Sequence, residues 1–360
     1  MMDYMKAYKN VLDAFSLEGT IQEICPYGEG HINQTFLVTT STKRYILQVM
    51  NTHVFSDPDS LMKNICYVTK HLESKGIETL HVVFTKRNEP FLKLEDNSCY
   101  RIYDFIENTV TFQKATDPQV FCNSGYAFGE FQNYLKEFDA SVLTETIPNF
   151  HNTPIRVRNF LEALSKDVVS RAKECEKEIQ FVLERKDTLN LVVEGLQDGS
   201  IPLRVTHNDT KLNNILMDAD TLKARAVIDL DTIMPGSMLY DFGDSIRFGA
   251  STAAEDEKNL ELVHFDRSLF EAYTRGYYTA VADSITPKEV ELLPYSAYLL
   301  TMECGIRFLT DYLMGDVYFA TKYKEHNLIR CRTQFKLALE IYEVLDELKC
   351  LVKRIQEETK

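Results

Sequence analysis

Residues 205–218 read V-T-H-N-D-T-K-L-N-N-I-L-M-D, and residues 226–231 read A-V-I-D-L-D; together these two segments decide the fold. Asp209 follows an apolar lead-in, Asn214 comes five residues later, and Asp229 ends an apolar run. Phosphoryl transfer needs a carboxylate beside the acceptor hydroxyl and oxygen ligands for Mg²⁺. The pattern therefore predicts Asp209 as the catalytic base and Asn214 and Asp229 as metal ligands.

The same segments predict how these residues meet. Residues 214–218 and 223–230 are strand-like, and a hairpin of the two would bring Asp229 back beside Asn214. Asp209 alone could be a turn residue, and Asp229 alone could simply end a strand. The joint pattern favours a catalytic site over that simpler interpretation.

Three further residues near this motif have supporting or open roles. Asp241, in D-F-G, is expected to begin a helix and to hydrogen-bond the backbone of the catalytic loop, and His207 is expected to support the same loop. Asp231 remains open between an additional metal ligand and a solvated loop acid.

Composition excludes several classes of function. The chain has 360 residues, a formal net charge of −14 and a pI near 5.1, which argues against nucleic acid or an anionic membrane as a partner. We see no signal peptide and no apolar run long enough to span a membrane, so we expect a cytoplasmic protein. The eight cysteines form no C-x-x-C pair, which predicts reduced thiols rather than a zinc site or disulfides.

Hydrophobic periodicity predicts two lobes in an α+β fold. A helix at residues 3–15 precedes a β-rich stretch with one embedded helix at 57–75, and the composition becomes helical after about residue 107. We expect a small β-rich lobe over residues 1–106 and a larger, mainly helical lobe over 107–360. The predicted strands are 20–26, 34–40, 44–50, 81–85, 90–94 and 100–106, and the predicted helices are 121–138, one or two within 156–195, and several from 265 onward.

The motif H-N-D-x-x-x-x-N…I-D-L-D resembles the aminoglycoside phosphotransferase and choline kinase superfamily, whose fold is protein-kinase-like. Asn208 stands where that superfamily usually has glycine. Over nearly the whole chain, G-E-G-H-I-N-x-T, Y-I-L-Q-x-M-N, F-G-x-F-Q-N-Y-L and T-M-E-C-G-I-R-F-L are similar to the N-acetylhexosamine 1-kinase family. The resemblance implies ATP and Mg²⁺, and an activity that phosphorylates the anomeric hydroxyl of N-acetylglucosamine and N-acetylgalactosamine.

The nucleotide side is less regular. Gly28 and Gly30 flank a turn where backbone amides could approach phosphates, although a bare G-x-G is also a plain hairpin turn. The strand 44–50 should carry a phosphate-binding lysine, but Gln48 occupies that place. Lys211 is a candidate for the missing cation, with a solvated loop lysine as the alternative.

The hinge and the acceptor site rest on the resemblance. Tyr103-Asp104-Phe105-Ile106 matches the family's hinge, where the Asp104 carbonyl and the Ile106 amide would read adenine. Four residues are candidates for sugar contact: His31, Phe248, Arg307 and Tyr318.

Each of those four also has a simpler explanation. His31 could be a turn residue, Phe248 and Tyr318 could fill core, and Arg307 could pair with Glu303 one helical turn earlier.

Two rival functions stay open. The first is a kinase for another small acceptor of the choline, homoserine or aminoglycoside type. The second is a non-catalytic nucleotide-binding pseudokinase, which only Gln48 favours. For the favoured function we expect ATP and an N-acetylhexosamine as partners, without nucleic acid or membrane, and a monomer or weak dimer.

Overall fold

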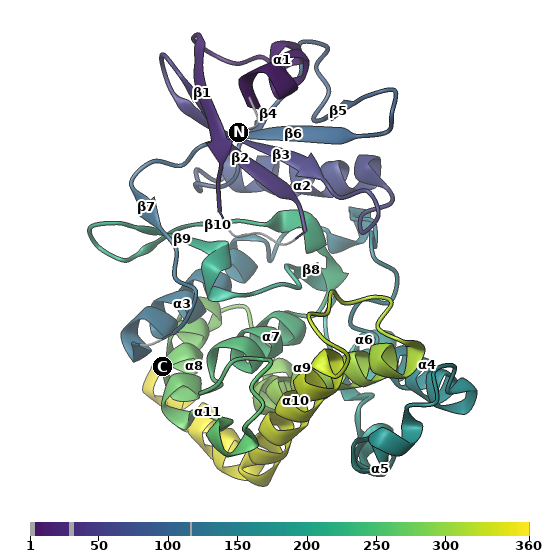
Figure 1. Cartoon of the computed structure of the whole chain (residues 1–360). Helices are drawn as coiled ribbons and strands as arrows, with labels where there is room; N and C mark the ends of the chain where they lie inside the picture. The colour runs from purple at the N-terminus through teal and green to yellow at the C-terminus, as the bar shows by residue number, and fades with distance from the viewer. Residues whose placement is uncertain (1–3, 29–31, 116, 360) are drawn as a thin grey trace.

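The structure, a computed structural model, describes residues 4–28, 32–115 and 117–359 and divides into a small sheet-based lobe and a larger helical part (Figure 1). Within the described residues, the small lobe holds a six-stranded antiparallel sheet in the order β1-β2-β3-β6-β4, with β5 paired to β6. The predicted α+β, two-part architecture is confirmed. The strands are β1 Ile21–Pro26, β2 Gln34–Thr40, β3 Arg44–Met50, β4 Val82–Val83, β5 Leu92–Lys93 and β6 Cys99–Asp104.

Two helices cover this sheet. Alternate side chains of β2, among them Phe36 and Val38, are buried in one cluster with Val11 and Leu12 of helix α1 (Tyr4–Ala14). Helix α2 (Pro58–Ser74) instead contributes its buried face to the core that continues into the helical part. The small lobe therefore has a hydrophobic core of its own beside α1. The core beside α2 is continuous with that of the helical part.

Two small sheets lie between the small lobe and the helices (Figure 1). Strand β9 (Ile215–Asp218) pairs with β10 (Ala224–Val227) and with β7 (Thr109–Val110), which follows the connection from β6. Strand β8 (Arg204–Thr206) pairs with β11 (Met234–Gly236). The hairpin predicted from residues 214–230 is formed, and the two sheets hold both ends of the loops that carry the motif.

The helical part packs around α9 and around the pair α3 and α8. Gly276 on α8 permits the close approach of that pair, because a Cβ there would lie 1.9 Å from the Cys122 carbonyl oxygen on α3. The helices are α3 Pro118–Tyr134, α4 Thr153–Lys166, α5 Glu176–Arg185, α6 Leu191–Asp198, α7 Met238–Gly249, α8 Arg267–Val281, α9 Pro287–Met314, α10 His326–Glu343 and α11 Leu345–Thr359.

The structure differs from the sequence prediction in two places. The sequence predicts one or two helices within residues 156–195, but the segment belongs to three, α4, α5 and α6. Asp167 ends α4 in a left-handed conformation with φ of 34°, and short 3₁₀ turns separate the helices that follow. Strands β4 and β5 are much shorter than predicted, since only two residues of each pair with β6.

All eight cysteines are free thiols, as their spacing predicted. No helix among the described residues has the length and apolar character needed to cross a lipid bilayer.

Candidate active site

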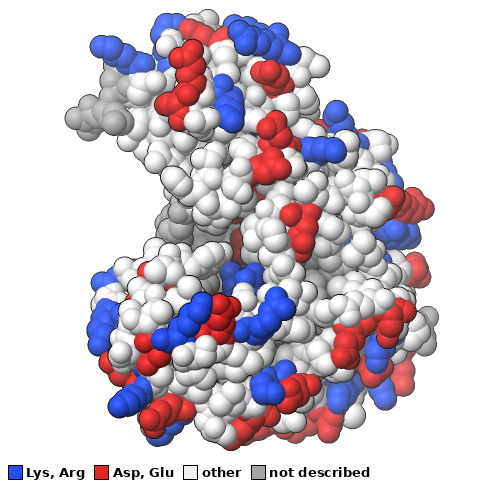
Figure 2. All heavy atoms as spheres, turned by 90° about the vertical axis from the view of Figure 1, so that its right-hand side faces the viewer, with Lys and Arg blue, Asp and Glu red and all other residues white. Residues whose placement is uncertain are grey.

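The surface is hollowed between the small lobe and the helical part (Figure 2). The catalytic loop of residues 207–214 joins β8 to β9, and a second loop of residues 228–233 joins β10 to β11. Both loops lie at the junction of the two parts of the molecule (Figure 1). The residues of the sequence motif are therefore gathered where the two parts meet.

Buried polar contacts shape the catalytic loop. His207 bonds the Ile228 carbonyl oxygen through Nε2 at 2.9 Å, and its ring packs edge-on against Phe128 and Phe131. Asn208 has φ of 67°, a left-handed conformation that asparagine tolerates better than most residues, and its amide donates to the Thr232 carbonyl oxygen at 2.7 Å. This explains how asparagine occupies the position where related sequences usually have glycine.

Asp241 braces the same loop from helix α7. Its carboxylate accepts hydrogen bonds from the backbone N–H of His207 at 3.0 Å and of Asn208 at 2.8 Å, and from the Gln132 amide at 2.8 Å. The Asp241 carbonyl oxygen also accepts from the Thr210 hydroxyl at 2.6 Å. Burial raises the pKa of Asp241, against the lowering effect of His207 and these bonds.

Asp209, Lys211 and Asn214 form one group. Lys211 Nζ lies 2.7 Å from Asp209 Oδ1, and the Asn214 amide nitrogen lies 2.8 Å from the Asp209 carbonyl oxygen and 3.2 Å from Oδ2. Although burial acts to lower it, Asp209 raises the pKa of Lys211, so the lysine is charged. Because Asn214 uses its nitrogen on Asp209, its oxygen is the atom left to bind a cation.

Asp229 lies close to these charges without a partner. The residue is exposed, and its carboxylate has no hydrogen bond or ion pair with the described residues. Although the residue is exposed, the protein atoms around its carboxylate raise the pKa of Asp229 to about 7; Asp231 and Asp209 add to the rise, while Arg101 and Lys211 oppose it. A divalent cation at this point would relieve the repulsion, so the donor set of Asp229 and Asn214 fits Mg²⁺.

Asp231 has a different environment, which resolves one open alternative. It is 4% exposed, and its oxygens lie 2.5 Å from Arg101 Nη1 and 2.8 Å from Arg101 Nη2. The Asn33 amide also donates to it at 2.7 Å. The alternative of a solvated loop acid is wrong, because Asp231 is buried and lies against the Arg101 guanidinium.

Sequence reasoning missed Arg101. It lies on β6 opposite Gln48 on β3, and its Nε donates to the Gln48 Oε1 at 2.9 Å. Gln48 in turn donates through Nε2 to the Thr35 hydroxyl at 3.2 Å. The available signal was a charged residue in the otherwise apolar and aromatic strand C-Y-R-I-Y-D, since a buried charge requires a partner.

Of the two glycines in the G-x-G turn, the structure describes Gly28. Gly28 has φ of 74° and open space around it, so a conformation that favours glycine leaves room for an approaching group. Gly30 and His31 lie outside the described residues.

The hinge between β6 and β7 has a free donor. The Ile106 carbonyl oxygen accepts from the Thr109 hydroxyl at 2.9 Å, whereas the Ile106 N–H has no acceptor among the residues the structure describes. The Asp104 carboxylate is engaged outside the cleft by Lys43 and His81, each at 3.0 Å. Only main-chain groups of this segment remain available.

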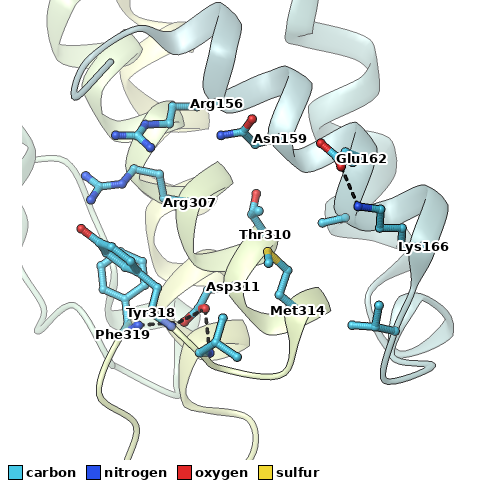
Figure 3. Close-up of a pocket in the computed structure, with 13 residues that line it drawn as sticks. Arg156, Asn159, Glu162, Lys166, Arg307, Thr310, Asp311, Met314, Tyr318 and Phe319 are labelled. Carbon is cyan, nitrogen blue, oxygen red and sulfur yellow. Dashed lines mark hydrogen bonds and ion pairs between the residues drawn. The ribbon is translucent and has the colours of Figure 1, made fainter. Parts of the chain in front are cut away.

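Arg307 and Tyr318 line one cavity of about 440 Å³ between α4, α9 and residues 317–319. Figure 3 shows Arg156 from α4 and Arg307 from α9 pointing to the same side, with the Tyr318 hydroxyl close to Arg307. The Arg307 guanidinium lies 5.3 Å from the Phe150 ring centroid and 5.8 Å from that of Tyr318. The structure thus brings two of the four candidate acceptor residues together.

Two of the simpler explanations are wrong: the ion pair of Arg307 with Glu303 and the core position of Phe248. Glu303 bonds His151 at 2.7 Å and Thr153 at 2.5 Å, so it is not the ion-pair partner of Arg307. Phe248 is 36% exposed and belongs to neither hydrophobic core cluster, and it is not among the residues that line the cavity. Phe248 is therefore not part of the cavity that Arg307 and Tyr318 line.

Asp244 and Arg247 on α7, also missed from the sequence, connect the two groups. Asp244 accepts from the Thr210 N–H at 3.2 Å and from Arg247 Nε at 2.9 Å. Although burial acts to raise it, Arg247 and Lys211 lower the pKa of Asp244. Arg247 is an electrostatic neighbour of Lys211 on one side and of Cys304 on the other, and Cys304 is a neighbour of Arg307.

Comparison with known proteins identifies solved structures of similar fold. The chain resembles the structure of a microcompartment-associated aminopropanol kinase, with 14% identity, a TM-score of 0.63, and coverage of 95% of this chain and 98% of that one. It resembles spectinomycin phosphotransferase APH(9)-Ia in complex with ADP and spectinomycin, with 13% identity, a TM-score of 0.61, and 95% and 98% coverage. It also resembles choline kinase from Cryptosporidium parvum Iowa II, with 15% identity, a TM-score of 0.58, and 96% and 98% coverage.

Likeness at such low identity concerns the fold. The sequence itself matches the profile of the phosphotransferase enzyme family, APH, over residues 23–280, which is more than half of the chain and includes the whole catalytic motif. The chain therefore belongs to the phosphotransferase enzyme family.

Proposed function

We propose that the protein is a kinase that transfers the γ-phosphoryl group of ATP to the anomeric hydroxyl of an N-acetylhexosamine. The observation that carries the transfer chemistry is the group formed by Asp209, Lys211 and Asn214, with Lys211 2.7 Å from Asp209 and the unpartnered Asp229 as an electrostatic neighbour of Asp209. A positioned acid, a cation and oxygen donors for a metal are the parts that phosphoryl transfer requires.

Asp209 acts on the acceptor in this proposal. Its carboxylate accepts a hydrogen bond from the acceptor hydroxyl, aligns the oxygen with the phosphorus and takes the proton as the bond to phosphorus forms. Lys211, 2.7 Å from Asp209, places positive charge where the transferred group becomes more negative. Asp241 holds the loop that positions both residues.

Asn214 and Asp229 would hold Mg²⁺, which when bound neutralises charge on the ATP phosphates. The raised pKa of Asp229, about 7, supports this role because a bound cation would favour its ionised form.

The nucleotide would lie against the small lobe. The Ile106 N–H and the Asp104 carbonyl oxygen would read adenine, and the turn that begins at Gly28 would cover the phosphates. The similar spectinomycin phosphotransferase structure contains ADP, which supports a nucleotide donor for this chain as well.

We place the acceptor in the cavity that Arg307 and Tyr318 line, although Asp209 is not one of its lining residues, and the charges of this cavity favour a neutral acceptor. Arg156 donates only to the Phe150 carbonyl oxygen, and Arg307 has no acidic partner among the described residues. The acids of the cavity are already engaged, Glu162 by Lys166 at 2.6 Å and Asp311 by three backbone N–H groups. Guanidinium groups beside aromatic rings suit the hydroxyl and acetamido oxygens of a sugar and repel a cationic acceptor.

An amino-alcohol acceptor is the second candidate, because two of the similar structures are an aminopropanol kinase and a choline kinase. A cationic acceptor would need unpaired acids or an aromatic cage free of cations at the site. Instead, the Arg307 guanidinium lies over the rings of Phe150, Tyr318 and Phe319. We therefore favour the sugar as acceptor.

The experiment is ATP consumption with Mg²⁺ and, in separate reactions, N-acetylglucosamine, N-acetylgalactosamine, choline, homoserine, an aminoglycoside or no acceptor. We expect turnover with the two sugars and a phosphorus NMR signal of a sugar 1-phosphate. Asp209→Asn is the control and should lower turnover by about 10²- to 10⁴-fold without unfolding the protein. Turnover with choline but not with either sugar would refute the proposed acceptor. If none of the acceptors gave turnover, the non-catalytic pseudokinase would be the remaining alternative.

The predictions of a cytoplasmic location and of a monomer or weak dimer accompany this proposal. Sedimentation analysis of the purified protein tests the second of them.

A further inference from the structure

Arg101 and Gln48 face each other across two neighbouring strands of the small lobe. They are directly opposite in the antiparallel pair of β3 and β6, so their side chains leave the sheet on the same face. Kinase-like sheets carry a phosphate-binding lysine on the strand where Gln48 lies. Arg101 therefore places a positive charge one strand away from the position of the missing lysine.

The acid that accompanies this charge also comes from an unusual element. In protein kinases a glutamate on the helix of the small lobe pairs with the lysine. Here the corresponding helix α2 presents Met62, whose sulfur lies 3.9 Å from Arg101 Nη1. The carboxylate comes instead from Asp231, on the loop that also contains Asp229, with contacts of 2.5 Å and 2.8 Å to the two terminal nitrogens of Arg101.

These contacts also set the direction of the Gln48 amide. Its oxygen accepts from Arg101 Nε at 2.9 Å, so its nitrogen is turned toward Thr35 at 3.2 Å. Thr35 lies on β2, the strand that follows the glycine turn. Gln48 thus directs its N–H groups, rather than its oxygen, toward Thr35 near the start of β2.

We propose that Arg101 is a positioning residue for the nucleotide phosphates. Held by Asp231, it supplies the positive charge that β3 lacks, and it orients the Gln48 amide so that its N–H groups can donate to phosphate. A cation, a neutral donor and an acid from three different elements replace the lysine and glutamate of other kinases. This inference rests on the proposed function only in taking ATP as the phosphoryl donor.

A purely structural role is the competing explanation. Arg101 is 1% exposed, and removing one partner of a buried ion pair destabilises a protein whatever its function. Loss of stability therefore does not distinguish the two roles. Affinity for the phosphates does, because a structural defect weakens binding of AMP and ATP together, whereas a phosphate-positioning residue affects ATP far more than AMP.

The experiment measures the dissociation constants of ATP and AMP by calorimetry at fixed Mg²⁺, without any acceptor. We expect Arg101→Met to weaken ATP binding by about 10- to 100-fold, the usual worth of a charge-assisted contact, and AMP binding by less than about 3-fold. The double variant Gln48→Lys with Arg101→Met moves the cation to β3 and should bring the ratio of the two constants back to within about 5-fold of wild type.

Arg225→Met is the matched control, because Arg225 on β10 also bridges to the small lobe, through Glu78 at 2.5 Å, but on the surface. It should leave the ratio unchanged. An Arg101→Met protein whose affinity for ATP relative to AMP equals that of wild type overturns the inference. A double variant whose relative affinity for ATP stays as weak as that of Arg101→Met also overturns it.

If Arg101→Met does not fold, Gln48→Leu replaces it, because it removes the amide that Arg101 orients and keeps the ion pair with Asp231; an unchanged ratio of the two constants then overturns the inference. A wild-type protein that binds ATP but phosphorylates no N-acetylhexosamine would refute the proposed acceptor. The inference about Arg101 would still be tested by the ratio of the ATP and AMP dissociation constants.

Discussion

Asp229 and Asp231 lie two residues apart on one short turn, yet their surroundings are opposite. Asp231 is 4% exposed and is bonded by Arg101 and Asn33, whereas Asp229 has no bonded partner among the described residues. The protein itself satisfies the charge of Asp231. The charge of Asp229 has no such partner in the protein. Burial and the two acidic neighbours, Asp231 and Asp209, therefore raise the pKa of Asp229.

The backbone contributes to this difference. Asp229 has φ of 59°, a left-handed conformation that aspartate adopts more readily than most residues, and the 3₁₀ turn Leu230–Thr232 follows at once. Uncommon backbone conformations persist where the surrounding structure holds them, often at functional sites. Here β10 and β11 hold both ends of the segment, so the two acids are fixed in separate environments.

The largest expected effect tests the acid that lacks a partner. Asp229→Ala should lower Mg²⁺-dependent turnover by about 10³-fold or more, because a bound metal ion contributes several kcal/mol of charge stabilisation in such reactions. Its stability should stay near that of wild type, since no bonded partner is lost. Initial rates over a Mg²⁺ titration, together with thermal unfolding, provide the measurement.

Asp220→Ala is the control for this change, because Asp220 is an exposed acid on the nearby turn between β9 and β10. It should retain wild-type rates and the wild-type Mg²⁺ requirement. If Asp229→Ala showed the same Mg²⁺ dependence as wild type, the assignment of Asp229 as a metal ligand would be wrong.

The next effect concerns the acid that the protein has already paired. Asp231→Asn should lower the free energy of unfolding by about 3 kcal/mol, because it leaves Arg101 buried without a compensating charge. Urea unfolding followed by circular dichroism measures this loss. Asp13→Asn, which removes an exposed partner of Lys9, should change stability by less than about 1 kcal/mol. Equal losses in the two variants would contradict the contrast between buried and open acids.

The sequence predicted the turn better than it predicted the contacts of the turn. Asp209, Asn214 and Asp229 belong to two segments that a local hairpin brings together, so their spacing alone indicates that they meet. The contact between Arg101 and Asp231 joins residues 130 positions apart. It depends on the register of β3 with β6 and on how the two lobes pack, neither of which is visible in local periodicity.

The acceptor side shows the same limit. The spacing of Glu303 and Arg307, one helical turn apart, suggested an ion pair, but His151 and Thr153 from another part of the chain take the carboxylate. Helical spacing identifies which side chains can meet and does not say which tertiary neighbour competes for them. Arg156, on a different helix, could not be associated with Arg307 before the structure placed both in one cavity.

The smallest effect concerns the pH dependence of stability in the metal-free protein. An acid whose pKa is higher in the folded state than in the unfolded state binds more protons when folded, so stability falls as pH rises between the two values. For Asp229 that window runs from about 4, the ordinary range, to about 7 in the folded protein. Because water in the cleft screens this carboxylate, we expect Asp229→Asn to gain only about 1 kcal/mol over wild type at pH 8 and nothing at pH 4. Mg²⁺ should abolish the difference by stabilising wild type alone, and chemical unfolding at the two pH values, with and without the ion, measures it. A gain that is the same at pH 4 and pH 8 would show that the charge of Asp229 is compensated within the protein, as that of Asp231 is.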